Sequence, residues 1–423
     1  MQKLPAGAII YDPKRGRMAN ISHPAFAMLA FTLLTALPYL VPMEYMEIIK
    51  LATPGKHLMV CSLIGSIVAG LWILYDLLAR PQFLAGGRPQ SDDFIRTMWQ
   101  AARGLIWIAI AANAVVLVYA APRMLDSVFA AKKALEDFEG VNILTQSFLF
   151  AIGPYLYLSE IQKKPYWRTL LVLSALLAVR AFMMAERLAL MEIAVPALVV
   201  LSLRRQISIT VGRLAALVTG VPVLFVTAEV FRSFNAKFVE ETGWAYLDFS
   251  FILQWNLERL ALYYTDVTNK FYLILNTGYF YTTAFYEEGI QRILARFGFE
   301  EVSNSALSEW VYLFGAGNPE MTNPGGLASM FTDMGWWAVP ALLFFAVMLL
   351  VAHWSAARGS IFCLAVYPVM FLAMVELPRF VYLYQSRVVF PFAFFLVVWL
   401  AALLLSSRTR SAPLLEQQPE TVG

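Results

Sequence analysis

Long apolar runs recur along this chain at lengths that suit membrane-spanning helices. A hydrocarbon core of about 30 Å is crossed by about 20 helical residues. Only 14% of the residues are charged and 60% are hydrophobic, whereas a soluble domain carries about 25% charged residues. We therefore expect an all-α, polytopic membrane bundle of about ten transmembrane helices, a single domain over residues 1–423. The runs cover approximately 24–43, 57–79, 101–121, 143–160, 169–185, 188–203, 214–230, 327–352, 360–377 and 388–406.

The connections between these runs differ in charge from one side to the other. Lysine and arginine gather in the leader, in alternate connections and in the tail, while the opposite connections balance their lysines with acids. Because basic short loops stay in the cytoplasm, both termini are predicted to be cytoplasmic in a bacterial inner membrane, with the first run retained as a span. The basic set comprises Lys3, Lys14, Arg15, Arg17, Arg80, Arg88, Arg96, Lys163, Lys164, Arg168, Arg204, Arg205, Arg213, Arg358, Arg408 and Arg410.

The interval 231–326 is long, and this map places it on the opposite, extracytoplasmic side. Its many tyrosines and tryptophans are interspersed with Arg232, Arg259, Arg292 and Arg296. Aromatic side chains collect at membrane interfaces as anchors, and that explains most of these rings, but rings beside amides and carboxylates also bind sugars. We predict a large periplasmic loop with amphipathic helices here, and a disordered cytoplasmic tail at 411–423.

Charged residues near the ends of the runs form four sets, all on the predicted extracytoplasmic side. Interhelical ion pairs would explain each set structurally, for instance Glu376 with Arg379. The arginines outnumber the acids near the spans, however, and an excess of cations in a low-dielectric cleft suits an anionic ligand such as a polyprenyl pyrophosphate. The sets are Arg180, Glu186, Arg187 and Glu192; Glu229 and Arg232; Asp333; and Glu376, Arg379 and Arg387.

Other kinds of site find little support. Ser91-Asp92-Asp93 is typical of a helix N-cap rather than of paired metal ligands. Cys61 and Cys363 lie in separate apolar runs, and no His, Cys or Asp cluster has metal-ligand spacing. The net charge of +3 is too small to indicate nucleic acid. We expect no metal, no cofactor and no nucleic-acid partner.

The order of these features resembles the O-antigen polymerase family, the Wzy-type oligosaccharide repeat-unit polymerases, over roughly residues 165–340. The matching features are the basic turn from Arg180 to Arg187, the segment Glu229-Val-Phe-Arg232-Ser233, the segment Glu258-Arg259-Leu-Ala-Leu-Tyr263-Tyr264, and the segment from Asn323-Pro-Gly-Gly to Asp333-Met-Gly335. Arg232 and Gly243 also have the spacing of an arginine and a glycine in the large periplasmic loop of that family.

The resemblance implies an enzyme with a fold like that of the GT-C membrane glycosyltransferases. Such an enzyme joins undecaprenyl-pyrophosphate-linked repeat units on the periplasmic face of the membrane, without metal or nucleotide, in the synthesis of O-antigen, capsule or exopolysaccharide. Its partners would be lipid-linked glycans, the bilayer, a chain-length regulator and a flippase.

Glycan transfer leaves a pyrophosphate, so fixed cations must stabilise the charge that develops on the leaving group. We expect Arg187, Arg232 and Arg259 to do this, while the general base for the acceptor hydroxyl stays open among Glu258, Asp266 and Asp333. The predicted substrate-binding residues are Arg180, Tyr263, Tyr264, Asn323, Arg379 and Arg387.

Three other functions compete with a polymerase. An O-antigen ligase is disfavoured, because that family is implied to use a histidine in its periplasmic loop and none lies within 231–326. A lipid-linked oligosaccharide flippase or another transporter is the main alternative, although the chain shows no internal repeat and its charges crowd at one face. A non-enzymatic partner in polysaccharide export is the third.

Overall fold

The structure is a computed structural model that describes residues 11–12, 17–18, 22–24, 26–27, 44, 91–124, 139–183, 187–203, 249–282, 290, 294 and 323–410. Within these ranges the regular secondary structure is helical, apart from one antiparallel pair of two-residue strands, β1 (Tyr11–Asp12) and β2 (Arg17–Met18). The helices are α3 (Asp92–Met124), α5 (Glu139–Leu144), α6 (Ile152–Ile161), α7 (Trp167–Met183), α8 (Arg187–Leu203), α11 (Phe249–Thr277), α14 (Gly326–Met334), α15 (Ala338–Ala357), α16 (Ile361–Glu376) and α17 (Ser386–Arg410), with 3-10 turns η2 (Gly335–Trp337) and η3 (Tyr382–Tyr384).

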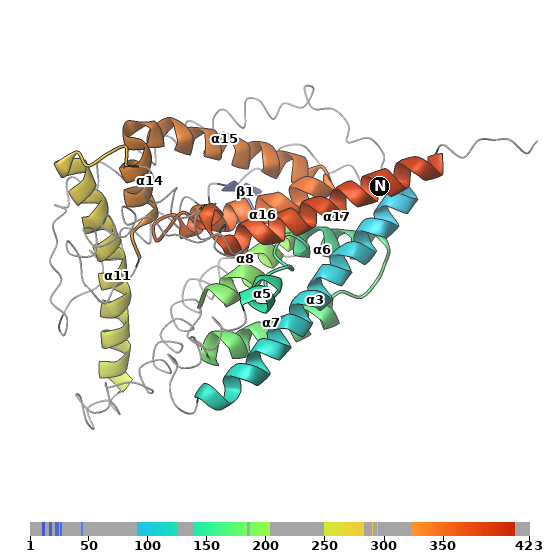
Figure 1. Ribbon diagram of the computed structural model, residues 1–423, viewed down its shortest axis with the longest axis horizontal. Helices are drawn as coiled ribbons and strands as arrows, with labels where there is room; N and C mark the ends of the chain where they lie inside the picture. Colours follow the sequence, from blue (N-terminus) through green and yellow to red (C-terminus); the bar gives the residue numbers. More distant parts are fainter. Residues whose placement is uncertain are drawn as a thin grey trace, which may run out of the picture.

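Helix α16 lies at the centre of the described bundle. It packs against α6, α8 and α15, while α3 packs against α6, α7 and α17 (Figure 1). The α16 side chains Tyr367, Leu364 and Leu372 are fully buried, as expected for a helix that is apolar all round. Helix α11 stands to one side of the bundle and contacts the shorter helix α14 (Figure 1).

Three described helical stretches are long and apolar enough to cross a membrane, namely Asp92–Arg123, Gly326–Ala357 and Ser386–Ser406. Two shorter apolar helices, Leu188–Leu203 and Ile361–Glu376, accompany them. An all-helical chain compatible with a membrane protein is therefore confirmed at this level. The predicted runs 57–79 and 214–230, and most of 24–43, lie outside the described residues.

The apolar run 143–160, predicted to be one span, is interrupted. It is divided between α5 and α6, and consecutive turns occupy residues 145–151 between the two helices. Helix α6 has ten residues and is about 15 Å long, half the thickness of a hydrocarbon core. Ser147 explains part of the interruption, because its hydroxyl donates across the bundle to the Leu105 carbonyl at 2.8 Å.

The run 327–352 bends rather than forming one straight helix. Helices α14 and α15 meet at the η2 turn and run in clearly different directions (Figure 1). Gly335 begins this turn with a φ of 56°, and a Cβ added there would lie 2.5 Å from the Tyr281 ring. Only glycine suits both the backbone conformation and the space, so Gly335 sets the direction in which α15 leaves.

The described bundle has two distinct ends. At the Trp99 end, the start of α3 meets the end of α6 through a hydrogen bond from Trp99 Nε1 to Ser159 Oγ at 2.8 Å. The α15–α16 connection joins them there, since a Cβ on Gly359 would lie 2.4 Å from the Tyr157 hydroxyl. At the opposite, Glu192 end, α8 meets the α16–α17 connection. Five of the predicted cytoplasmic basic residues belong to elements of the Trp99 end. They are Arg96, Lys163, Lys164, Arg168 and Arg358. Their common location is compatible with the prediction that they share one side of the membrane.

Candidate functional site

A buried carboxylate, Glu192, organises the Glu192 end of the bundle. It lies on α8 with only 1% of its side chain exposed, in surroundings where a lone charge would be costly. Arg387 binds it in a bidentate fork, from Nε to Oε1 at 2.7 Å and from Nη2 to Oε2 at 3.0 Å. The Tyr382 hydroxyl also donates to Oε1 at 2.7 Å. The α16–α17 connection is thus attached to α8 by three hydrogen bonds to one carboxylate.

Gln146 completes this group from the turns that interrupt the 143–160 run. With its amide oriented so that donors meet acceptors, its oxygen accepts from Arg387 Nη2 at 2.6 Å and its nitrogen donates to the Arg387 carbonyl at 3.1 Å. The adjacent Thr145 carbonyl accepts from Asn113 Nδ2 at 2.9 Å, and Asn113 Oδ1 accepts from Arg180 at 3.1 Å. The interrupted segment therefore supplies a side-chain amide to Arg387 directly and a carbonyl to Asn113, which in turn binds Arg180.

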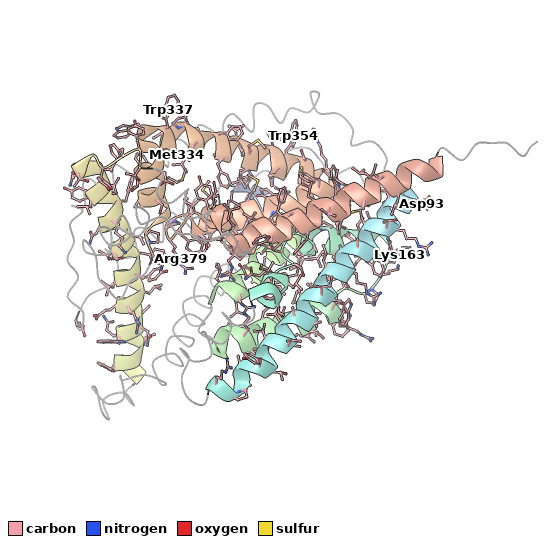
Figure 2. The ribbon with its side chains drawn as sticks, viewed as in Figure 1. Asp93, Lys163, Met334, Trp337, Trp354 and Arg379 are labelled. Atoms are coloured by element: carbon pink, nitrogen blue, oxygen red, sulfur yellow. The ribbon has the colours of Figure 1, made fainter. Side chains whose placement is uncertain are left out.

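A second group surrounds Arg379 on the same connection. Its Nη1 donates to Glu376 at 2.6 Å, and its Nε donates to the Tyr263 hydroxyl of α11 at 3.0 Å. Asn323 Nδ2 donates to the same hydroxyl. Tyr263 accepts from two donors, and no acceptor for its own hydroxyl proton occurs in the described part of the chain. Figure 2 marks Arg379 at this point, between α11 and the end of α16.

An ion pair on α11 anchors the turn that precedes α14. Lys270 lies 2.6 Å from Asp266, one helical turn away, and both side chains are almost fully buried. Lys270 Nζ also donates to the Asn323 carbonyl at 2.8 Å. A Cβ on Gly326 would lie 2.2 Å from the Leu377 carbonyl, so this turn packs directly against the end of α16. Burial lowers the Lys270 pKa from its usual 10.5, and Asp266 only partly offsets that effect.

In both ion pairs the arginine side chain is more exposed than its carboxylate partner. Arg379 and Arg387 have 23% and 20% of their side chains exposed, against 5% and 1% for Glu376 and Glu192. Burial is the largest single influence and by itself would lower the Arg379 pKa, but Glu376 together with Tyr263 and Tyr264 outweighs it and keeps the pKa above its usual range. No acceptor for Arg379 Nη2 occurs among the described residues. The Arg379 guanidinium group can therefore bind an anion through Nη2.

Burial also raises the pKa of the Tyr382 phenol well above its usual 10.0, with Glu192 as the next cause. Glu376 acts on Tyr382 in the same direction, and this links the two groups electrostatically. Tyr382 therefore stays protonated and continues to donate to Glu192 over the physiological pH range.

The structure brings some of the predicted site residues together and separates others. One group comprises Arg379, Tyr263, Asn323 and Asp266. Arg387 lies nearby in the sequence, at the start of α17. Tyr264 packs against Tyr263, with ring centroids 5.7 Å apart. Asp333 lies at the far end of α14 from the Asn323 turn.

The remaining candidates are only partly described. Glu258 is buried on α11 and accepts from Gln254 Nε2 at 2.8 Å and from the Glu44 amide at 2.7 Å. Arg259 is half-buried on the same helix. Arg187 begins α8, but its side chain is not described, and Arg232 lies outside the described residues.

The pairing differs from the predicted excess of arginines. Among the described residues, each of the cations Lys270, Arg379 and Arg387 has its own carboxylate. Glu376 and Arg379 are therefore compatible with both predicted roles. The ion pair joins the end of α16 to the following connection, and the Arg379 side chain is still partly exposed for an anion. A net positive charge at this end would have to come from the other predicted arginines.

Three residues of the site were not predicted. Lys270 could have been found from its i,i+4 spacing to Asp266, which places opposite charges on one helix face. Tyr382 and Gln146 carry no such signal, because their partners lie 190 or more residues away in the chain. Groups of three or more potential metal ligands are absent from the described part of the chain.

Comparison with known proteins gives no relative. No family model matches the chain, and no curated protein or solved structure matches it. The site is therefore interpreted from its own chemistry.

Proposed function

We propose that this protein is a polymerase of lipid-linked glycans, a metal-independent glycosyltransferase of the bacterial inner membrane. It would join undecaprenyl-pyrophosphate-linked oligosaccharide repeat units on the periplasmic face, in the synthesis of O-antigen, capsule or exopolysaccharide. The full chain would contain about ten transmembrane helices in a GT-C-like arrangement, with the 231–326 loop in the periplasm and both termini in the cytoplasm.

The observation that carries this proposal is the pair of partly exposed arginine side chains, Arg379 and Arg387, each held by a buried carboxylate. They lie at the end of the bundle opposite the basic connections. A guanidinium group held in place in this way binds phosphate oxygens without reorganising, and its planar fork matches their geometry. The Tyr263 hydroxyl proton beside Arg379 adds a neutral donor.

The reaction would exchange one bond at the anomeric carbon. The acceptor sugar hydroxyl attacks this carbon, the bond to the pyrophosphate oxygen breaks, and the pyrophosphate leaves with the electron pair. The hydroxyl proton passes to a carboxylate base, for which Glu258, Asp266 and Asp333 remain the candidates. Asp266 is the weakest of the three, because its carboxylate is already paired with Lys270.

Arg187, Arg232 and Arg259 would contribute further positive charge around the leaving group, with Arg180, Tyr264 and Asn323 shaping the site around the lipid-linked glycan. Neutralising the developing charge with preorganised arginines removes the need for a divalent cation. A chain-length regulator and a flippase would act as partners.

Deletion of the gene tests the proposal. A polymerase mutant should still display single repeat units at the cell surface and should lose the polymer ladder on a gel. Complementation by the wild-type gene should restore the ladder, whereas the Arg379→Ala variant should not, at equal abundance in the membrane. A deletion strain with an unchanged ladder would refute the proposal.

Transport of a lipid-linked oligosaccharide is the second candidate function. The buried Asp266–Lys270 pair would favour it if α11 lay at membrane depth, because ionisable groups within the membrane often mark transport pathways. The same deletion separates the two functions. A transporter mutant would accumulate lipid-linked repeat units that a membrane-impermeant glycosidase cannot reach in intact cells, whereas units that await a polymerase are accessible from outside.

An O-antigen ligase is less well supported. His23 and His353 are each at most 2% exposed and lie against each other, with ring centroids 5.6 Å apart. His353 also contacts the Tyr367 ring inside the bundle at 5.0 Å. Neither histidine can reach a substrate from that position.

A further inference from the structure

Two cations converge on one indole ring at the Trp99 end, far from the candidate site. Lys164 Nζ lies 3.6 Å from the Trp99 ring centroid, and the guanidinium carbon of Arg103 lies 5.3 Å from the same centroid. Both cationic side chains are exposed, whereas Trp99 is only 7% exposed. Cations over an indole face are attracted by its quadrupole, but two on one ring also repel each other.

The local backbone holds this arrangement in place. Helix α6 ends with the Lys164 amide bonded to the Ser159 carbonyl at 2.8 Å, while Lys163 adopts a left-handed conformation with a φ of 53°. Trp99 Nε1 donates to the hydroxyl of the same Ser159 at 2.8 Å. One serine therefore fixes both the ring and the turn that carries Lys164, so the site is preorganised.

Neither cation is neutralised by a residue in the described part of the chain. The described residues supply no carboxylate partner to Lys164 or Arg103, and their contacts with Trp99 are their only side-chain interactions there. Arg96, seven residues before Arg103 on α3, is exposed and has no such partner either. Three exposed cations are thus gathered at this end and can bind an anion together.

The expected depth of these cations in the bilayer indicates which kind of anion they bind. Arg103 is the last charged residue before a stretch of α3, residues 104–122, without any charge. Such a residue lies at the level of the lipid headgroups. Trp107 and Ile108 lie about one helical turn after Arg103 and are each 45% exposed. They offer an apolar surface on the side of the cations that faces the centre of the bilayer. A soluble anion would make no use of that surface.

We propose that Lys164, Arg103 and Trp99 form a binding site for the phosphate headgroup of an anionic phospholipid, whose acyl chain lies along Trp107 and Ile108. The two cations contact the phosphate oxygens, and the indole keeps them together when no lipid is bound. This site is independent of the polymerase proposal, because it requires only that the chain is embedded in a bilayer. It would position the Trp99 end at the cytoplasmic leaflet.

Native mass spectrometry of the purified full chain in detergent tests the site. The probes are phosphatidylglycerol, phosphatidylcholine of the same chain length, and inorganic phosphate. We expect the wild-type chain to bind phosphatidylglycerol about tenfold more tightly than phosphatidylcholine, with binding that weakens as salt rises. The variant Arg103→Gln/Lys164→Gln should lose that preference. The control variant Lys163→Gln removes one positive charge from the same turn, but from a lysine that does not contact the Trp99 ring. It should retain the preference for phosphatidylglycerol within about twofold.

An unchanged preference in the double variant would overturn the site, and so would an equal loss in Lys163→Gln. If inorganic phosphate displaced phosphatidylglycerol at equal concentration, the ligand would be a soluble phosphate and not a lipid, and the proposal would fail. Size-exclusion chromatography checks that the double variant is folded. Should it aggregate, Lys164→Gln alone, in an exposed connection, carries the test with an expected loss of about fivefold.

Discussion

Arg387 and Glu192 are 195 residues apart in the chain, and yet the guanidinium group of one binds both oxygens of the other, at 2.7 and 3.0 Å. The pair joins the beginning of α17 to α8 in the apolar interior of the Glu192 end. Because the Glu192 side chain is 1% exposed and the Arg387 side chain 20% exposed, the pair holds a buried carboxylate while its cationic partner lies nearer the surface.

The first prediction concerns the stability of this pair. Arg387→Gln should lower the stability of the folded protein by about 3 kcal/mol, because it leaves a buried carboxylate with only neutral donors. The double variant Glu192→Gln/Arg387→Gln should lose less than either single variant. The measurement is the thermal unfolding midpoint in detergent, with Tyr382→Phe as a control that costs about 1 kcal/mol. Additive losses would show that the two residues do not interact.

The second concerns Lys270 and alkaline pH. Since its pKa in the folded protein lies below 10.5, the unfolded chain binds more protons between the two values, and stability should rise with pH in that window. Lys270→Met should abolish this rise and lower stability at neutral pH, because Asp266 then lacks its cation. The check is the difference in unfolding midpoint between variant and wild type from pH 8 to 10. A difference that is constant with pH would contradict the shifted pKa.

The third concerns the arginines as phosphate ligands. Arg379→Lys, Arg259→Lys and Arg232→Lys should each give single repeat units in place of a ladder at normal membrane abundance, because an ammonium group cannot make a bidentate contact. A loss of on the order of a hundredfold in rate is expected for each. Arg358→Lys is the matched control, since Arg358 stacks on Trp354 at the other end, 3.8 Å from the ring centroid. Normal ladders from the three variants would remove these arginines from the site, and lost protein would assign them a structural role.

The fourth concerns topology. Reporter fusions after Gly243 and after Arg358 should report opposite sides of the membrane, with Arg358 in the cytoplasm. Helix α15 runs from the η2 turn to the Trp99 end, so its C-terminal connection should share a side with Lys163. Cysteine labelling at Lys163 and Arg358 in intact cells provides the control. Labelling of the two positions from different sides would refute the map.

The fifth concerns divalent cations. Polymer formation in isolated membranes should survive treatment with EDTA, because arginines are expected to supply the positive charge that a metal supplies elsewhere. The measurement is ladder length with and without the chelator, and membranes depleted of the protein serve as the control. Loss of the ladder with recovery on adding magnesium or manganese would overturn the arginine mechanism.

Local features of the chain could be predicted well. The ends of α8, α16 and α17 lie close to those of the apolar runs, and Ser91 caps α3 by accepting from the Phe94 amide at 3.3 Å. The Glu376–Arg379 pair also follows from i,i+3 spacing. Each of these depends on residues within one or two helical turns, where the hydrogen bonding and periodicity of the backbone are fixed by neighbouring side chains.

The sequence alone thus indicates a helical chain compatible with a membrane protein, with charges of different character on its two predicted sides. The tertiary structure alone decided that Glu192 pairs with Arg387, that Tyr382 and Gln146 join them, and that the 143–160 run is interrupted to supply those polar groups. The physical reason is burial. A carboxylate removed from water must find its donors wherever packing brings them, and packing depends on the whole chain rather than on the spacing of residues along it.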